Sequence, residues 1–408
     1  MARLSRIATE TVLNAAARDE PTETTAVIDK TVWIVVAGGG TIGHLNPGLA
    51  AAEALVDLGL HRDQVHFVGS RRGVEAARLP ATGFGLTLLP GRGIQRKLSI
   101  QNIGALWGLL GAFIQAFVLV RRLRPAVVLA TGGYASAPCA LAAWLLRIPL
   151  VVAEQNAIPG LVNRLAAKVA KAAAVSFADT PLPRAELVGN PVRAEMLAVD
   201  RVRDRNQARV ALGIDTDRVL VVVFGGSLGA RRINEAALGA RKRWADRADL
   251  AIYHVIGDRD WSRHQAELAT PLPADGLLYR AVRFEADMPS VLAAADVAVC
   301  RAGATTIAEL AVVGVPSVLV PLPIATADHQ SANARALVAV GAAVSVPDAE
   351  FDTDRLVGEV EAMIADPAVL AARSRAATRL ARPDAAEQLA AMVVRHSART
   401  LASQEGSR

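Results

Sequence analysis

Glycine-rich turns followed by chemically active side chains are the most informative feature of this 408-residue sequence. In the segment Gly38–His44, the glycines lead to His44, which would lie on the first turn of a helix. A helix N-terminus disfavours the charged imidazolium, so a histidine there stays neutral near pH 7 and can accept a proton. The segment therefore predicts a general base next to a tight turn. A histidine that only packs or hydrogen-bonds is the alternative.

Two further turns supply groups that suit a nucleotide. Gly225–Ala230 follows a strand-like run, and its free N–H groups together with the helix dipole favour an anion such as a diphosphate. The hydroxyl of Ser227 adds a donor. In Cys300–Leu310, a turn of small residues is followed by Glu309, whose carboxylate can accept hydrogen bonds from both ribose hydroxyls. Plain strand–helix turns and a solvent-facing glutamate are the alternatives.

Other ligands match the sequence less well. The first turn formally fits the G-x-G-x-x-G dinucleotide pattern, but the next strand is followed by Arg71 and Arg72 rather than by an acidic residue for a ribose hydroxyl. Because these two arginines could instead bind a 2′-phosphate, an NADP-dependent oxidoreductase stays open as an alternative. The D-x-D triplets that begin at Asp215, Asp258 and Asp352 lie outside the glycine turns, so we predict no metal site.

The elements that must hold these turns are short β-branched strands that alternate with helices rich in alanine and leucine. Because the strands are hydrophobic nearly throughout, we expect them to be buried on both faces in parallel sheets of an α/β fold. The turn residues Gly189–Arg193 divide the chain into two such series, which predicts two facing Rossmann-like domains with a cleft between them. The expected strands are Val32–Ala37, Val65–Val68, Leu86–Leu89, Val127–Ala130, Leu150–Ala153 and Ala172–Val175, then Val219–Phe224, Ala251–Ile256, Leu277–Val282, Val297–Cys300, Ser317–Val320 and Ala343–Val346.

The same signals give the domain boundaries. We expect domains over residues 31–192 and 193–370, followed by C-terminal helices over 371–408. Residues 1–30 carry charges and no apolar stretch, so a loose extension is predicted rather than a secretory signal. Cys139 and Cys300 lie far apart in apolar settings and are expected to be reduced core residues.

The overall charge indicates an acidic partner. The formal net charge is +6, while only 4% of the residues are aromatic, so a phosphorylated substrate or an anionic membrane is favoured over nucleic acid. Ile103–Val120 is almost free of polar side chains and is flanked by cations, with Arg96 and Lys97 before it and Arg121 and Arg122 after it. It is either a buried crossover helix or an apolar surface that enters an anionic leaflet.

Taken together, the motifs resemble those of the MurG glycosyltransferases of peptidoglycan synthesis. The matching segments run in order from Thr31 to Val346 and are Gly39–His44 with Pro47–Ala50, Thr131–Tyr134, Glu154–Arg164, Gly189–Arg193, Gly225–Ala230, Arg301–Ala304 and Asp328–Ala334. The resemblance implies a GT-B fold and an inverting transfer that needs no metal or cofactor. The implied substrates are UDP-N-acetylglucosamine as donor and undecaprenyl-diphosphoryl-N-acetylmuramoyl-pentapeptide as acceptor.

The resemblance also implies roles for individual residues. His44 would be the base for the acceptor hydroxyl, with Thr41, Ile42 and Gly43 at the donor–acceptor junction. The expected donor contacts are Asn156 and Gln330 with the sugar, Arg193 from the hinge, Ser227 with the diphosphate, Glu309 with the ribose, the backbone of Glu285 with uracil, and the backbone of Ala304, Thr305, Thr306, Ile307 and Ala308 around the nucleotide. Residues 31–192 would face the acceptor and the cytoplasmic side of the cell membrane, as part of a peripheral protein, and residues 193–370 would bind the UDP-sugar.

Three positions depart from the usual pattern of that family. Ile42 and Leu228 stand where glycine and glutamine are usual, and Glu285 replaces an apolar residue. The first change would tighten or shift the acceptor loop, and the second would remove a polar contact to the donor. Two alternatives therefore stay open: a GT-B transferase with another lipid acceptor, and a non-catalytic paralogue that binds nucleotide sugars.

Overall fold

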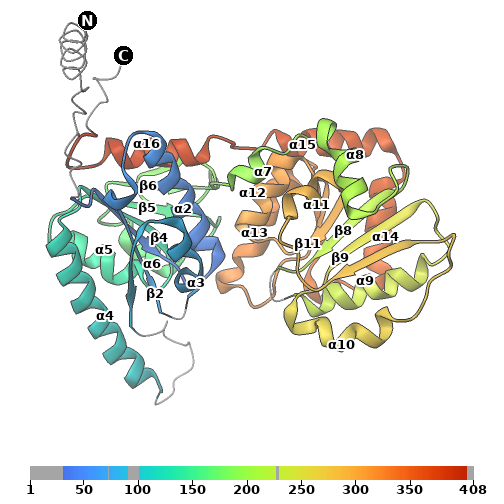
Figure 1. The fold of residues 1–408 in the computed structure, drawn as a ribbon, viewed down its shortest axis with the longest axis horizontal. Coiled ribbons are helices and arrows are strands. Elements are labelled where there is room, and N and C mark those ends of the chain that lie inside the picture. Colours follow the sequence, from blue (N-terminus) through green and yellow to red (C-terminus); the bar gives the residue numbers. More distant parts are fainter. Residues whose placement is uncertain (1–30, 72, 91–100, 227–228, 402–408) are drawn as a thin grey trace, which may run out of the picture. The chain divides into compact units, whose positions relative to one another are not determined.

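Two parallel β-sheets, one in each half of the chain, form the framework of the protein (Figure 1). The structure is a computed structural model that describes residues 31–71, 73–90, 101–226 and 229–401, and the described residues from Val32 onward belong to one compact unit. Because each half has its own parallel sheet, the unit contains two α/β domains, as the sequence predicted. The predicted extension over residues 1–30 lies outside the described residues.

The N-terminal sheet has seven strands in the order β3-β2-β1-β4-β5-β6-β7, and all neighbouring pairs are parallel. The central strands β1 and β4 are buried almost throughout, which explains their small and β-branched residues. The strands are β1 (Ile34–Gly38), β2 (Val65–Ser70), β3 (Gly85–Leu89), β4 (Val127–Gly132), β5 (Leu150–Glu154), β6 (Ala172–Val175) and β7 (Ala185–Leu187). The helices of this half are α2 (Ile42–Asp57), α3 (Glu75–Arg78), α4 (Gln101–Leu123), α5 (Ser136–Leu145) and α6 (Leu161–Ala166).

The C-terminal sheet has six strands in the order β10-β9-β8-β11-β12-β13, again all parallel. Its strands are β8 (Val219–Phe224), β9 (Leu250–Val255), β10 (Leu278–Val282), β11 (Val297–Cys300), β12 (Ser317–Leu319) and β13 (Ala343–Ser345). The helices that follow the hinge are α7 (Ala194–Leu197), α8 (Arg201–Leu212), α9 (Arg231–Arg243), α10 (Asp258–Leu268), α11 (Met288–Ala294), α12 (Ala304–Val313), α13 (His329–Ala339), α14 (Thr353–Ile364), α15 (Pro367–Thr378) and α16 (Ala385–Arg395).

The strand predictions are confirmed, because each expected strand is present with its ends shifted by two residues at most. The strand β7 was not predicted: its sequence Ala-Glu-Leu is exposed and has no apolar run. Cys139 and Cys300 are buried and free of disulfides, as expected.

Both glycine turns lie where the strand order of a sheet reverses. The neighbours of β1 are β2 and β4, and the neighbours of β8 are β9 and β11. At such a reversal the connections leave on opposite faces of the sheet, which opens a crevice beyond the carboxyl ends of the strands. Gly39 follows β1 and Gly225 follows β8. Each half of the chain therefore presents a glycine turn at the place where α/β sheets bind ligands.

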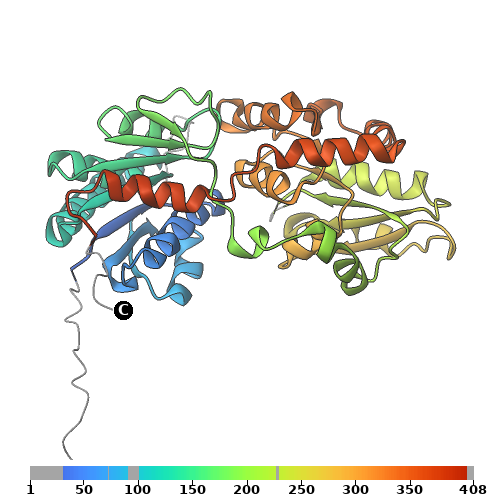
Figure 2. The same cartoon turned by 90° about the horizontal axis from the view of Figure 1, so that it is seen from above.

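The last helix, α16, returns to the N-terminal half and lies along α2 (Figures 1 and 2). Leu389 and Val393 of α16 are buried in the same apolar cluster as Leu55 of α2. Beyond the helix, Nη2 of Arg399 donates a hydrogen bond to the carbonyl oxygen of Val32 at 3.2 Å. Residues near the end of the described chain thus complete the N-terminal core.

Candidate functional site

His44 lies on the first turn of α2, directly after the glycine turn that follows β1. Thr41 is the N-cap residue, and Gly39 and Gly40 have positive φ angles of 139° and 93°. Glycine adopts such angles without strain, so the backbone of the turn can approach a ligand closely. The strand–turn–helix context predicted for this segment is confirmed, and the residues expected at the donor–acceptor junction, Ile42 and Gly43, begin the helix.

The hydrogen-bond partners of the His44 imidazole indicate which ring nitrogen carries the proton. Its Nδ1 lies 3.3 Å from the carbonyl oxygen of Gly39 and 3.3 Å from Oγ1 of Thr41. A carbonyl oxygen only accepts, so Nδ1 carries the proton and Nε2 keeps its lone pair. Burial lowers the pKa of His44 below its ordinary value of 6.5, while the carboxylates of Glu154 and Glu75 act in the opposite direction. His44 is therefore neutral near pH 7, as a general base must be.

The turn after β4 packs against this imidazole. Gly132 and Gly133 have φ angles of 97° and 81°. A Cβ atom on Gly132 would lie 3.2 Å from Cδ2 of His44, and one on Gly133 would lie 2.0 Å from the carbonyl oxygen of Gly39. The positive φ angles favour glycine at both positions, and at Gly133 there is also no room for a Cβ atom. The segment Thr131–Tyr134, which received no role from the sequence, thus forms a wall of the His44 site.

Two buried carboxylates near His44 were not predicted as site residues. Glu154 ends β5 and is 3% exposed, while Glu75 on α3 is 1% exposed. Oε1 of Glu75 accepts a hydrogen bond from the N–H of Gly40, and its Oε2 has no partner among the described residues. Burying a carboxylate costs free energy, so we expect both carboxylates to have a role beyond packing. The signal for Glu154 was its place in a matching motif, whereas Glu75 stands in none.

The two residues expected at the sugar come from different halves of the chain. Asn156 follows β5, and its Nδ2 donates to Oε1 of Glu154 at 3.2 Å. On α13, Oε1 of Gln330 accepts from the backbone N–H of Leu322 at 3.0 Å. Both amides are thus oriented by protein groups. Their contact with a sugar stays a prediction.

The second glycine turn is described only in part, because Ser227 and Leu228 lie outside the described residues. Gly226 and Gly229 have positive φ angles of 87° and 80°, and α9 follows directly. A Cβ atom on Gly229 would lie 2.3 Å from the carbonyl oxygen of Ile256, so the turn is tightly packed. A turn of this kind at a helix N-terminus suits an anion. The contact of Ser227 with a diphosphate stays a prediction.

Glu309 and Arg193, which the sequence assigned to the ribose and to the hinge side of the donor, lie next to each other. Oε1 of Glu309 is 3.8 Å from Nη2 of Arg193. Burial raises the pKa of Glu309 to about 7, and the charge of Arg193 offsets this only in part. A carboxyl group that titrates near neutral pH in a protein is typical of a binding or catalytic site.

Glu285 lies in the loop between β10 and α11. Its carboxylate accepts hydrogen bonds from the hydroxyl of Tyr253 at 2.6 Å and from the N–H of Asp287 at 2.7 Å. These bonds explain how a charged residue is accommodated where an apolar one is usual. The expected backbone contact of Glu285 with uracil stays a prediction.

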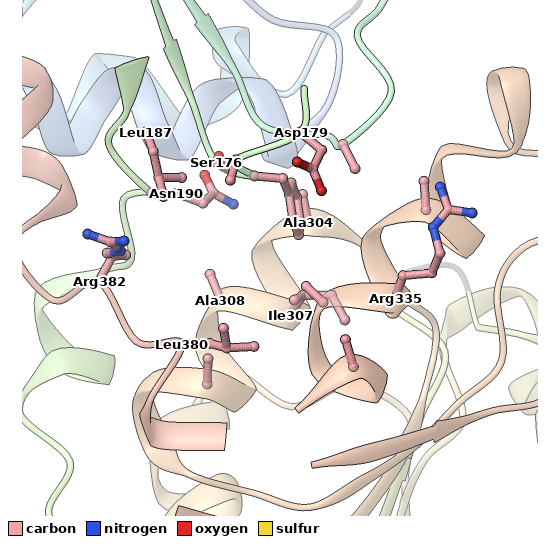
Figure 3. Close-up of a pocket in the computed structure, with 18 of the residues that line it drawn as sticks. Ser176, Asp179, Leu187, Asn190, Ala304, Ile307, Ala308, Arg335, Leu380 and Arg382 are labelled. Atoms are coloured by element: carbon pink, nitrogen blue, oxygen red, sulfur yellow. The ribbon is translucent and has the colours of Figure 1, made fainter. Parts of the chain in front are cut away.

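A cavity of about 440 Å³ lies beside α12 and is lined by Ala304, Ile307 and Ala308 (Figure 3). Their i, i+3, i+4 spacing puts the three side chains on one face of the helix. Glu309 is turned by roughly 150° from that face, because an α-helix advances about 100° per residue. The cavity and the carboxylate of Glu309 therefore lie on different sides of α12. The expected contact of the nucleotide with the backbone of residues 304–308, Thr305 and Thr306 included, stays a prediction.

The D-x-D triplets lie on different elements, and the first carboxylate of each has a structural partner. Asp215 pairs with Arg218 at 2.8 Å, Asp258 pairs with Arg283 at 2.6 Å, and Asp352 caps α14. Within the described ranges, no group of three or more His, Cys, Asp and Glu side chains is placed to hold a metal ion. That the protein needs no metal stays a prediction.

An apolar surface covers α4, α5 and α6. Its exposed side chains are Leu110, Ile114 and Val118 on α4, Leu141, Trp144 and Leu145 on α5, and Leu161, Leu165 and Val169 in and after α6. The opposite face of α4 carries Ala112, Ala116 and Val120, which are fully buried. In its described part, the helix is therefore buried on one face and exposed and apolar on the other, and entry of the exposed face into an anionic leaflet stays a prediction. Among the helices that the structure describes, none combines the length and apolarity needed to cross a bilayer.

Comparison with known proteins identifies relatives of both halves. Residues 34–175 match the glycosyltransferase family 28 N-terminal domain, and residues 220–389 match the family 28 C-terminal domain. The chain is 39% identical to the UDP-N-acetylglucosamine–N-acetylmuramyl-(pentapeptide) pyrophosphoryl-undecaprenol N-acetylglucosamine transferase of Myxococcus xanthus, over 88% of this chain and 92% of the relative. It is 40% identical to the enzyme of the same name from a Nocardioides species, over 88% and 97%.

Solved structures agree with these sequence matches. Acinetobacter baumannii MurG is 30% identical and superposes with a TM-score of 0.71, over 88% of this chain and 98% of that one. A UDP-GlcNAc 2-epimerase from Neisseria meningitidis bound to UDP-GlcNAc gives a TM-score of 0.61 at 12% identity, over 89% and 99%. The second likeness shows the fold alone.

Proposed function

Since the chain belongs to the MurG group of glycosyltransferase family 28, we propose that it transfers N-acetylglucosamine from UDP-N-acetylglucosamine to undecaprenyl-diphosphoryl-N-acetylmuramoyl-pentapeptide, with inversion at the anomeric carbon. Similarity over 88% of the chain to transferases of that name supports the reaction. The structural observation that carries it is the neutral His44, whose Nε2 keeps a lone pair beside the glycine turn of the N-terminal sheet.

The donor belongs to the C-terminal half in this proposal. The N–H groups of the turn after β8, the N-terminus of α9 and the hydroxyl of Ser227 stabilise the diphosphate of the leaving group. The carboxylate of Glu309 accepts hydrogen bonds from the ribose hydroxyls, with Arg193 beside it. Since N–H donors and a helix dipole stabilise the charge of the leaving group, the reaction needs no metal ion.

The acceptor meets His44 in the N-terminal half. Nε2 of His44 takes the proton of the acceptor hydroxyl while the hydroxyl oxygen forms a bond to the anomeric carbon. The bond from that carbon to the diphosphate breaks, and UDP leaves with the electron pair. One base is sufficient, because inversion requires a single displacement.

We further propose that the apolar surface on α4–α6 docks on the cytoplasmic face of the cell membrane, as in a peripheral protein. The same elements carry exposed cations: Arg121 and Arg122 lie in the last turn of α4, Arg124 follows α4, Arg147 follows α5, and Arg164, Lys168 and Lys171 lie in and after α6. Apolar side chains that enter the headgroup region and cations that meet anionic lipids both favour such adsorption. A lipid-linked acceptor would then be held on the half that carries His44.

The test is transfer of radiolabelled N-acetylglucosamine by the purified full chain, with EDTA present, to lipid-linked muramoyl-pentapeptide and to a panel of other polyprenyl-linked acceptors. Product that forms only with the muramoyl-pentapeptide, together with release of UDP, supports the proposal. Transfer to another lipid instead would favour the GT-B alternative. Binding of UDP-N-acetylglucosamine without transfer to any acceptor would favour the paralogue, and binding of NADPH in place of UDP would favour the oxidoreductase.

A further inference from the structure

We propose that Glu154 is a positioning residue for His44: its buried carboxylate fixes the loop after β5 beside the imidazole and stabilises the imidazolium that forms when His44 takes the acceptor proton. The inference rests on the proposed function, in which His44 is the general base. It gives a role in the reaction to a carboxylate that has no cationic partner in the described part of the chain.

The sheet places the two residues at one edge. Strands β1, β4 and β5 are consecutive neighbours and parallel, so their carboxyl ends meet at the same side. The turn of His44 follows β1, Gly132 ends β4, and Glu154 ends β5. Because the residue between them is glycine, no side chain of β4 separates the imidazole from the loop that Glu154 holds.

The carboxylate of Glu154 is fully hydrogen-bonded by neutral donors. Its Oε1 accepts from the N–H and from Nδ2 of Asn156, at 2.9 and 3.2 Å. Its Oε2 accepts from the N–H of Gly160 and from Nδ2 of Asn163, both at 3.0 Å. Four such bonds fix the orientation of the carboxylate, but amide donors leave its net charge in place. The charge is therefore available to act on a nearby ionisable group.

Asn163 is hydrogen-bonded to this carboxylate and lies near the imidazole. A Cβ atom placed on Gly132 would lie 3.3 Å from Nε2 of His44 and 3.3 Å from Nδ2 of Asn163. The amide and the imidazole are therefore close neighbours across Gly132, on the side of the imidazole that carries the reactive nitrogen. Asn163 is itself buried, and its Nδ2 also donates to the carbonyl oxygen of Ala153 at 3.1 Å, so it has little freedom to move.

The electrostatic effect has the sign that a base requires. Burial lowers the pKa of His44, and of the charged groups that face it Glu154 raises the pKa most, Glu75 raises it less, and His329 lowers it. A general base works best when its pKa is close to the working pH, so the charge of Glu154 restores part of the basicity that burial removes. The same charge stabilises the imidazolium in the transition state, where the low local dielectric strengthens the interaction.

The test is the pH profile of kcat/KM for the full chain and for Glu154→Gln, measured by sugar transfer to the lipid-linked acceptor. Loss of the charge should move the acidic limb of the profile to lower pH, by roughly one unit, and should lower the plateau by about tenfold or more. Binding of UDP should be unchanged. Asn163→Ala is the matched control: it removes one donor but keeps the charge, so its limb should stay at the wild-type pH while its plateau falls.

A direct titration of His44 by NMR, with His44→Ala used to assign the signal, gives a second measurement that needs no turnover. The inference would be overturned if Glu154→Gln kept both the wild-type position of the acidic limb and the wild-type titration of His44. It would also be overturned if Asn163→Ala shifted the acidic limb as much as Glu154→Gln does. If Glu154→Gln does not fold, Glu154→Asp keeps the charge on a shorter side chain and should retain the position of the limb; a shifted limb there contradicts the inference. Absence of transfer by the wild-type protein would instead refute the proposed function, and the titration would still decide the effect of Glu154 on His44.

Discussion

Nδ2 of Asn333 donates a hydrogen bond to Oδ1 of Asn156 at 3.2 Å, which joins α13 to the loop after β5. In return, Oδ1 of Asn333 accepts from the N–H of Ala157 at 2.9 Å, and the side chain of Asn333 is fully buried. The amide therefore links the two halves of the chain beside the residues expected at the sugar. A substitution at Asn333 should therefore also change the orientation of the Asn156 side chain.

Asn333→Ala is expected to lower the free energy of unfolding by about 1–3 kcal/mol, because it leaves the N–H of Ala157 and Oδ1 of Asn156 without their partner. The KM for UDP-N-acetylglucosamine should rise as well. Urea unfolding and steady-state kinetics check both effects. Asn333→Asp keeps the acceptor for Ala157 but turns a buried carboxylate oxygen toward Oδ1 of Asn156 and the carbonyl oxygen of Ala302, so it should be destabilised as well. An alanine variant with wild-type stability and KM would show that the link is not required.

His44→Ala should lower turnover by roughly a hundredfold or more, which is typical for loss of a general base. Its affinity for UDP should stay near wild type, since His44 belongs to the N-terminal half and the turn after β8, proposed to bind the diphosphate, belongs to the C-terminal half. Kinetics of sugar transfer and calorimetric binding of UDP separate the two quantities. Near-wild-type turnover would remove His44 from the mechanism.

Binding of UDP-N-acetylglucosamine should tighten as the pH rises from 6 to 8. Burial holds the pKa of Glu309 at about 7, and ribose hydroxyls bind the carboxylate rather than the protonated acid. Binding thus requires loss of a proton, and linkage gives an increase in affinity of about tenfold over this range. Calorimetry at each pH measures it. In Glu309→Gln the affinity should be lower and nearly independent of pH; an equally steep pH dependence in that variant would assign the effect to another group.

Gly133→Ala should be far more damaging than Gly40→Ala, although both glycines have positive φ angles. A Cβ atom on Gly133 would lie 2.0 Å from the carbonyl oxygen of Gly39, whereas one on Gly40 would meet nothing within 4 Å. Gly40→Ala should therefore carry only backbone strain, of about 1 kcal/mol, while Gly133→Ala should also displace the wall of the His44 site. Thermal unfolding and turnover of the two variants provide the comparison. Equal effects would contradict the packing described for Gly133.

Ile114→Glu and Leu165→Glu should each weaken binding to vesicles that contain anionic lipid by about tenfold or more, because a charge replaces an apolar side chain that enters the headgroup region. Both residues are more than half exposed, at 54% and 56%, so stability should not change. Vesicle sedimentation measures the binding. The control is Val202→Glu, which makes the same kind of change at a 98% exposed site on α8. Unchanged binding of the first two variants would place the membrane contact elsewhere.

The strands and the context of His44 were predictable because their signals are local. A continuous apolar run such as Val219–Phe224 indicates a buried strand, and glycines between a strand and a helix indicate a turn that can hold a ligand. Glu309 was found for the same reason, since its distance from the turn at Gly303 is set by one helix. In these cases neighbours in sequence are also neighbours in space.

The carboxylate of Glu75 was not predictable in this way. It lies beneath a turn that is 35 residues away in sequence, and it fits there only because Gly39, Gly69 and Gly73 leave it room: a Cβ atom on any of them would meet its side chain within 3 Å. That arrangement depends on how β1 and β2 are paired. The partner of α16 was likewise hidden, because an amphipathic pattern reveals which face of a helix is buried but not which element covers it.

The return of α16 means that the chain passes between its halves twice. Gly189 on the first passage is so close to Arg382 on the second that a Cβ atom on the glycine would lie 2.5 Å from Cβ of the arginine. Two adjacent covalent connections restrict twisting more than bending, so relative motion of the halves should be a hinge rotation about one axis that passes through both connections. The N-terminal domain is also built from two separate segments of the sequence. A fragment that ends after the first passage would lack Leu389 and Val393 from its core and would expose Leu55. Neither half can therefore be excised cleanly with a single cut.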